Sequence, residues 1–353
     1  MPLSTTGKAA RKDLGPLALT LGEPAGIGPE ITFKAWQHRQ SAGLPPFALI
    51  APGDFVSRLR DRLSPDTPIQ VIDDLSDVPE VFENALPVFE ADLPRSIDMP
   101  EPGQPSPATA NLVVNSIRAA VALARSGQAC AVVTNPIAKS VLYEAGFSHP
   151  GHTEFLAELT AESNAPSPVP VMMLAIEGLR VLPLTIHVPL SAVHDLVTRA
   201  GIIETGRRIL KALGTDFGIE KPRLAVAGLN PHAGENGAMG SEEMDIIAPA
   251  VAALRADGAA VRGPVPADTL FHDRARAQYD AVLCMYHDQA LIPLKTLDFD
   301  RGVNITLGLP IVRTSPDHGT AFDIAGKGVA SADSLISALH MAAEIAARRA
   351  ARA

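Results

Sequence analysis

The sequence has few aromatic residues and no long apolar run, and each shortage excludes a class of protein. Among 353 residues there are one tryptophan and three tyrosines, too few to favour base stacking or a carbohydrate-binding platform. No stretch reaches the roughly 18 consecutive apolar residues of a membrane-spanning helix. We therefore expect no membrane span.

Cysteine is also scarce. The only two, Cys130 and Cys284, both lie in apolar runs, so we interpret them as reduced core residues and not as a disulfide pair. The N-terminal residues lack the apolar centre of a signal peptide, and we expect residues 1–15 to form a flexible tail. Together these features predict a cytoplasmic protein.

Positive charge is in short supply as well. Lysine and arginine number 30 against 39 acidic residues, which gives a formal net charge of −9. A nucleic-acid-binding protein needs a basic face, so we expect no nucleic-acid partner. This balance still leaves room for a small basic pocket that binds a phosphorylated metabolite.

What the chain does contain is the pattern of an α/β protein. Its length exceeds the usual limit of one hydrophobic core, which favours two lobes. A helical spacing over residues 109–126 precedes an apolar run at 129–133, the order typical of a parallel βαβ unit. Two further runs, 169–176 and 179–186, flank Glu177-Gly178 and predict a hairpin. The expected fold is two-lobed, with mixed, mostly parallel sheets and helices on both faces.

A glycine-rich turn follows the first predicted strand, at residues 17–21. It reads GEPAGIGPE and leads into a helical segment, with Pro29 at the expected first helical position. The glycines at 22, 26 and 28 do not match the dinucleotide fingerprint G-x-G-x-x-G. We interpret the stretch as a turn that exposes backbone N–H groups near a ligand, with a purely structural turn as the alternative.

Three histidines each follow a predicted strand, namely His187, His232 and His287. Ligands of open α/β sheets bind outside the carboxyl ends of the strands, so the three imidazoles are candidates to converge. Three neutral imidazoles suit Zn²⁺ or Co²⁺ with one position left for substrate. The alternative is that each is a hydrogen-bonded residue at the rim of a sheet, because no short histidine or cysteine spacing supports a metal site.

A second group of polar residues suits an anion. A helix N-terminus that carries an imidazole and a hydroxyl is a natural phosphate site, and an arginine can bind phosphate or carboxylate through two nitrogens. Ordinary surface charge is the alternative, although Asn304 lies within a strand-like run. The group comprises His152, Thr153, Lys295, Arg301, Asn304 and Arg313.

A glycine-containing loop, Asp317 to Gly328, precedes the last predicted helix, and its simplest interpretation is a connector. Its segment HGTAFDIAGKG resembles the loop of isocitrate and isopropylmalate dehydrogenases that wraps the adenosine half of NAD. The resemblance implies an isopropylmalate dehydrogenase-like fold. It also implies cofactor-binding roles for His318, Gly319, Thr320 and Asp323.

Further motifs narrow the resemblance to one family. From about Leu17 to Ala346 the chain is similar to the 4-hydroxythreonine-4-phosphate dehydrogenases of pyridoxal phosphate biosynthesis, through LTLGEPAGIGPE, GHTEFLAE, NPHAGENG, PADTLF, YHDQ and RGVNITLGLPIVRTSPDHGTA. This resemblance implies a first, cofactor-side lobe of residues 16–140 with about 305–353. It implies a second lobe of about 141–304 with the metal site and the dimer interface, and an active site in the cleft between the lobes.

The family resemblance also implies a reaction. It is the oxidation of 4-phosphooxy-L-threonine by NAD, with NADP as the alternative dinucleotide, to 2-amino-3-oxo-4-phosphooxybutanoate, which decarboxylates to 3-amino-2-oxopropyl phosphate. The enzyme would be a homodimer with a shared active site. A divalent metal (Zn, Mg or Co) would bind to His187, His232 and His287, the last from the partner subunit. Substrate would contact His152, Thr153, Lys295, Asn304 and Arg313.

The sequence leaves the general base and the exact substrate open. Asp268 and Lys295 are the candidates for the base. One alternative keeps the fold and family but oxidises 4-phospho-threonate. Another class of function is a three-histidine metal hydrolase or lyase without NAD, which the loop from Asp317 to Gly328 disfavours. A third is a metabolite-binding protein without catalysis.

Overall fold

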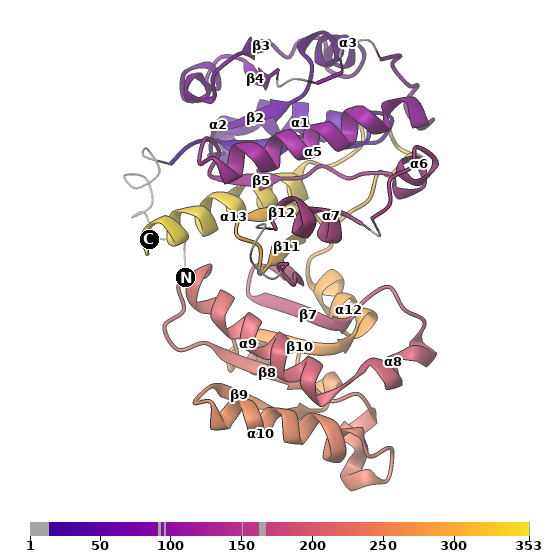
Figure 1. The fold of residues 1–353 in the computed structure, drawn as a ribbon, viewed down its shortest axis with the longest axis vertical. Helices are drawn as coiled ribbons and strands as arrows, with labels where there is room; N and C mark the ends of the chain where they lie inside the picture. Colours follow the sequence, from indigo (N-terminus) through magenta and orange to yellow (C-terminus); the bar gives the residue numbers. More distant parts are fainter. Residues whose placement is uncertain (1–13, 91–92, 95–96, 150, 162–166, 353) are drawn as a thin grey trace. The chain divides into compact units, whose positions relative to one another are not determined.

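The computed structural model describes residues 14–90, 93–94, 97–149, 151–161 and 167–352 (Figure 1). Residues 1–13 of the expected tail lie outside this part. The chain divides into two units. Unit 1 consists of the residues up to Pro170 together with Leu309–Ala351, and unit 2 of Val171–Gly308. Within the described residues, no helix is long and apolar enough to cross a membrane.

Unit 1 is built on parallel strands in the order β3-β4-β2-β1-β5-β12. The strands are β1 (Leu17–Thr20), β2 (Phe47–Ile50), β3 (Ile69–Ile72), β4 (Leu86–Phe89), β5 (Ala131–Val133) and β12 (Arg313–Pro316). The helices are α1 (Gly28–Gln37), α2 (Arg39–Ala42), α3 (Gly53–Leu63), α4 (Val78–Val81), α5 (Ala110–Arg125), α6 (Lys139–Glu144), α7 (His152–Leu159) and α13 (Asp333–Ala350). Two 3₁₀ turns, η2 (Leu75–Asp77) and η3 (Pro107–Thr109), complete the unit.

The core of unit 1 follows from its apolar runs. Strands β1, β2 and β5 are buried along their whole length, as expected for parallel strands covered on both faces. Helix α5 packs against β1 and β5, and α13 packs against β12 and β5 (Figure 1). The buried face of α5 includes Leu112, Val113, Ile117 and Val121, which confirms the helical spacing predicted from the sequence.

Unit 2 carries the strand order β11-β6-β7-β10-β8-β9. Its strands are β6 (Val171–Ile176), β7 (Leu179–Thr185), β8 (Arg223–Ala227), β9 (Ala260–Val265), β10 (Ala281–Tyr286) and β11 (Val303–Leu307). Its helices are α8 (Leu190–Leu196), α9 (Arg199–Thr215), the π-helical η5 (Glu243–Ile247), α10 (Ala248–Ala256), α11 (Asp273–Arg276) and α12 (His287–Leu297). Two further segments are η4 (Pro231–Gly237) and η6 (Ala267–Thr269).

The mixed sheet predicted from the sequence is confirmed in unit 2. Strand β6 runs antiparallel to both β7 and β11, whereas β7, β10, β8 and β9 are parallel. The predicted hairpin joins β6 to β7, and Gly178 supplies its positive φ of 75°. Cys284 belongs to the buried core around Val181 and Val282, as expected, whereas Cys130 is only half-buried, and both cysteines are free.

The division of the chain differs from the predicted lobes at two places. The described residues between 141 and 170 belong to unit 1, where the Phe155 ring of α7 packs edge-on against Phe147 with centroids 5.0 Å apart. Residues 305–308 belong to unit 2, because β11 pairs with β6 from Val303 to Leu307. Residues 64–104, which are rich in proline, contain the short strands β3 and β4 and the one-turn helix α4.

Candidate active site

Several of the residues predicted to bind an anion belong to unit 1, and Arg313 is the most buried of them. Arg313, the first residue of β12, is only 3% exposed. Its Nε and Nη2 donate hydrogen bonds to Thr134 Oγ1 at 3.2 and 2.6 Å, across the paired strands β12 and β5. His152 and Thr153 are the first two residues of α7, as the motif predicted. Both are partly exposed.

The His152 ring lies in a strongly cationic environment. Burial first, then the charges of Arg313 and Lys139, hold the pKa of His152 well below its ordinary value of 6.5. Its Nε2 is shielded from solvent and has no hydrogen-bond partner among the described residues. An orphaned polar atom next to two cations is an unusual arrangement, and a bound anion would satisfy it.

Lys139, like Thr134, was not among the residues that the motifs predicted to bind substrate. It is the exposed first residue of α6. Its ammonium lies so close to Gly151 that a Cβ at that position would stand 3.1 Å from Nζ. We call Thr134, Lys139, His152 and Arg313 the anion site. No local signal in the sequence marks Lys139, because its contact with Gly151 exists only in the folded chain.

The lowered pKa of His152 makes a prediction for stability. Below about pH 6.5 the His152 imidazole binds a proton in the unfolded chain but stays neutral in the folded chain. Acidification therefore destabilises the fold. His152→Gln removes this titration. Urea-unfolding midpoints of the wild type should therefore fall more steeply than those of His152→Gln between about pH 6.5 and pH 5. Parallel curves would show that the ring titrates alike in both states.

Two of the three predicted metal ligands lie together in unit 2. His187 follows β7 and His287 begins α12 directly after β10, and their ring centroids are 5.9 Å apart. The two strands are paired in parallel, with Thr185 opposite Tyr286, which brings the following residues side by side. Two imidazoles on one zinc ion, each at about 2.0–2.1 Å, have centroids roughly 5 Å apart. The observed spacing therefore suits a shared ion.

The neighbour of His287 supports the same interpretation. The Asp288 carboxylate Oδ1 lies 2.7 Å from His287 Nδ1. A carboxylate on one ring nitrogen orients the imidazole and leaves the other nitrogen for a metal, as is common among metal-binding histidines. The donor set thus fits a divalent ion of the zinc type.

His232 does not join this pair. Within the part of the chain that the structure describes, no three histidine, cysteine or carboxylate side chains converge on a position for one ion. His232 begins a run of left-handed backbone in η4, with φ of 52° at His232 and positive values through Asn236. Left-handed conformation costs about 1–2 kcal/mol for each non-glycine residue, so the surroundings must impose it.

A buried carboxylate anchors the residues that lead into that segment. Glu243 is 2% exposed, and its Oε1 accepts hydrogen bonds from the backbone N–H groups of Leu229 and Asn230, both at 2.7 Å. The Asn230 side chain donates to Glu243 Oε2 at 3.0 Å and to Glu242 Oε2 at 2.7 Å. The segment is therefore held in place from within unit 2.

The remaining predicted substrate residues of unit 2 are spread more widely. Lys295 lies near the end of α12, with Nζ 5.3 Å from the centroid of Phe299. Asn304 is half-buried on β11, opposite Leu174. Arg301 forms an ion pair with Asp298 and is 64% exposed, which favours ordinary surface charge. Asp268 is exposed in η6.

The glycine-rich turn is structural, which was the alternative interpretation. Residues 21–30 are all buried, and the turn uses its N–H groups internally. Glu23 N donates to Pro136 O, Ala25 N to Glu23 Oε1 and Ile27 N to Thr320 O. A Cβ on Gly26 would lie 2.8 Å from Thr320 O, so glycine permits close contact between this turn and the loop that begins at Asp317.

That loop presents its middle to solvent. Gly319, Asp323 and Gly328 are exposed, and a Cβ on either glycine would meet no atom within 4 Å. Open space beside glycines and an exposed carboxylate fit the adenosine half of a dinucleotide, since carboxylates accept hydrogen bonds from ribose hydroxyls.

Comparison with known proteins gives consistent results. The model of one protein family, described as pyridoxal phosphate biosynthetic protein PdxA, matches residues 48–342. A 4-hydroxythreonine-4-phosphate dehydrogenase of Methylorubrum populi is 58% identical over 334 residues, which cover 94% of this chain and 95% of the relative. One from Erythrobacter litoralis is 54% identical over 95% of this chain and 98% of the relative. A crystal structure of the Klebsiella pneumoniae enzyme of that name has a TM-score of 0.81 at 39% identity, over 94% of this chain and 99% of that one.

Proposed function

Because the chain belongs to the PdxA family of pyridoxal phosphate biosynthetic proteins, we propose that it oxidises 4-phosphooxy-L-threonine with NAD. The product, 2-amino-3-oxo-4-phosphooxybutanoate, is a β-keto acid that loses CO₂ to give 3-amino-2-oxopropyl phosphate. Among the observations on the structure, the anion site of unit 1 carries this proposal furthest. It offers the charge and the unsatisfied nitrogen that a phosphate monoester requires.

The anion site supports the phosphate end of the substrate. Arg313 remains charged at neutral pH although burial lowers its pKa to about 10, and Lys139 adds a second cation. The first N–H groups of the eight-residue helix α7 add a partial positive charge beside His152. These groups bind and orient the phosphate, so that the hydroxyl-bearing end of the substrate is presented for oxidation.

His187 and His287 support a divalent metal. When bound, the ion would polarise the substrate hydroxyl and lower its pKa. The family resemblance assigned His287 to the partner subunit, but in this chain His287 lies beside His187. We therefore assign the pair to one chain and His232, which stands apart from it, to a second copy.

Exposed apolar side chains in unit 2 support a homodimer. Large apolar residues with 40–73% exposure lie close in sequence to all three histidines, and apolar side chains gathered on a surface are typical of protein–protein contacts. They are Val188 and Leu190 after His187, Met239 after His232, and Ile292 and Phe299 after His287.

For the cofactor, we propose NAD bound by the loop that contains His318, Gly319, Thr320 and Asp323. The exposed Asp323 carboxylate suits a ribose diol and disfavours the extra phosphate of NADP by charge repulsion. Lys295 and Asp268 stay the candidates for the general base. Lys295 is half-buried and Asp268 is exposed.

The test is a steady-state assay of NADH absorbance with 4-phosphooxy-L-threonine and Zn²⁺, Mg²⁺ or Co²⁺. We expect NADH formation that a chelator abolishes, and a lower rate with 4-phospho-threonate. Activity with 4-phospho-threonate alone would show that this compound, and not 4-phosphooxy-L-threonine, is the substrate. No NADH with either compound would favour the hydrolase or lyase alternative.

A further inference from the structure

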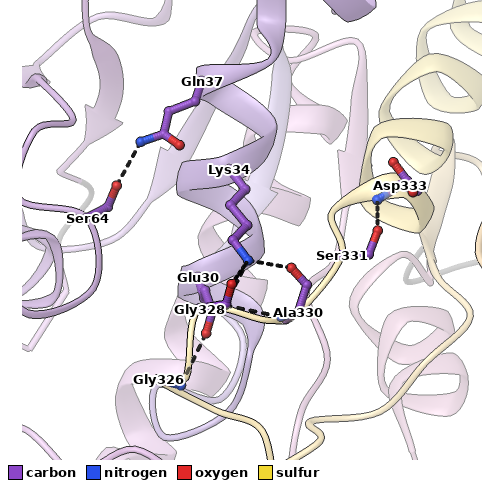
Figure 2. Close-up of polar contacts among 9 residues, drawn as sticks. All are labelled: Glu30, Lys34, Gln37, Ser64, Gly326, Gly328, Ala330, Ser331 and Asp333. Carbon is purple, nitrogen blue, oxygen red and sulfur yellow. Dashed lines mark hydrogen bonds and ion pairs between the residues drawn. The ribbon is translucent and has the colours of Figure 1, made fainter.

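One turn of helix α1 holds the end of the proposed cofactor loop. Glu30 is 4% exposed, and its carboxylate accepts hydrogen bonds from Gly326 N at 3.1 Å and Ala330 N at 3.3 Å (Figure 2). Lys34, one turn further along, donates from Nζ to Glu30 Oε1 at 3.0 Å. The same ammonium donates to the carbonyls of Gly328 at 2.9 Å and Ala330 at 2.6 Å.

The Glu30 carboxylate and the Lys34 ammonium bond to each other and to backbone groups of residues 326–330. A buried carboxylate is costly unless it is paired and hydrogen-bonded, and Glu30 meets both conditions. Its place in the first turn of α1 also favours a negative charge. An ion pair on a helix surface alone contributes little, but here the pair encloses backbone groups of residues 326–330. The arrangement therefore fixes a loop and not merely a helix.

The start of the same loop is held by the turn that precedes α1. Ile27 N donates to Thr320 O at 3.0 Å. Further along, a Cβ on Gly103 would lie 2.8 Å from Phe322 O. The loop is thus fixed near Thr320 and again at residues 326–330, while Asp323 between them stays exposed.

We propose that Glu30 and Lys34 are positioning residues for NAD, which hold the loop from Asp317 to Gly328 in the conformation that binds the dinucleotide. On this proposal they contact neither cofactor nor substrate. They hold the loop in order before NAD binds, which lowers the entropic cost of binding. The inference rests on the proposed function only in that the loop binds NAD.

The test compares Lys34→Met with Gln37→Met. Lys34→Met removes the three hydrogen bonds of the ammonium and keeps the apolar stem. Gln37 lies on the same helix and bonds Ser64 Oγ and Thr67 Oγ1, both at 2.9 Å and away from the loop, as Figure 2 shows for Ser64. Gln37→Met therefore controls for general weakening of α1. Glu30→Gln is a second variant, in case Lys34→Met does not fold.

Three quantities are measured, namely the NAD dissociation constant by calorimetry without substrate, hydrogen exchange of residues 317–330, and kcat and KM for NAD. We expect Lys34→Met and Glu30→Gln to weaken NAD binding by about tenfold and to speed exchange at 326–330, with kcat at saturating NAD close to wild type. Gln37→Met should match the wild type in all three.

Two outcomes overturn the inference. One is unchanged NAD binding in Lys34→Met together with faster exchange, which would show that loop order is irrelevant to the cofactor. The other is equal weakening by Lys34→Met and Gln37→Met. Both differ from failure of the proposed function, in which the wild type itself would bind no NAD.

Discussion

His232→Ala is expected to lose its metal and about a thousandfold or more in kcat/KM, because the ion contributes several kcal/mol of charge stabilisation. The fold should survive, since Glu243 holds the η4 segment through Leu229 and Asn230 and not through the imidazole. Elemental analysis and NADH formation are the measurements. His38→Ala, a change to an exposed histidine at the end of α1, is the matched control.

Mixing two inactive variants tests whether the three metal ligands come from two chains. If His187 and His287 belong to one chain and His232 to another, His232→Ala and His287→Ala complement each other. Each mixed dimer then contains one complete site, so random exchange restores about a quarter of the wild-type activity. A mixture as inactive as its parents would show that all three histidines come from one chain. Full activity of a metal-stripped wild type in the presence of a chelator would show that the reaction needs no metal.

Arg313→Met is expected to lower kcat/KM for the phosphorylated substrate by about a hundredfold or more, since loss of one partner of a buried charge pair costs 2–5 kcal/mol. Arg313→Lys should recover little, because an ammonium cannot bind phosphate through two fixed nitrogens. Metal content should not change, as the histidines belong to unit 2.

The control for this prediction is Arg207→Met. Arg207 is 60% exposed and its guanidinium pairs with Asp257, so its removal deletes a surface charge and an ion pair that includes none of the proposed ligand residues. The quantity to compare is KM for the substrate at saturating NAD. Equal kinetics of the Arg313 and Arg207 variants would remove Arg313 from the substrate site.

Local sequence patterns predicted many of the helices and strands. The spacing of apolar residues within a short segment determines which of its side chains are buried. The strand at 281–286, the hairpin at Glu177-Gly178 and the helix at 110–125 all follow from apolar spacing and turn residues. The pairing of His187 with His287 also follows from a simple rule, since both come directly after parallel neighbours.

The features that escaped prediction depend on contacts between distant residues. His232 lies in a left-handed segment, and the residues that lead into it are anchored by Glu243, which lies beyond the motif. The role of Lys139 becomes visible only when α6 lies against Gly151. The contact of Lys34 with Ala330 joins residues 296 positions apart. No pattern of local hydrophobicity records such pairings.

The distance of His232 from the other two histidines has a thermodynamic consequence. On the proposed arrangement, the ion is a cross-link between chains, so its binding and the association of the subunits are reciprocally linked. Whatever lowers the free metal concentration loosens the dimer, and dilution of the protein releases the metal. Activity would then depend on protein concentration and metal supply together, and neither dependence alone would describe the enzyme.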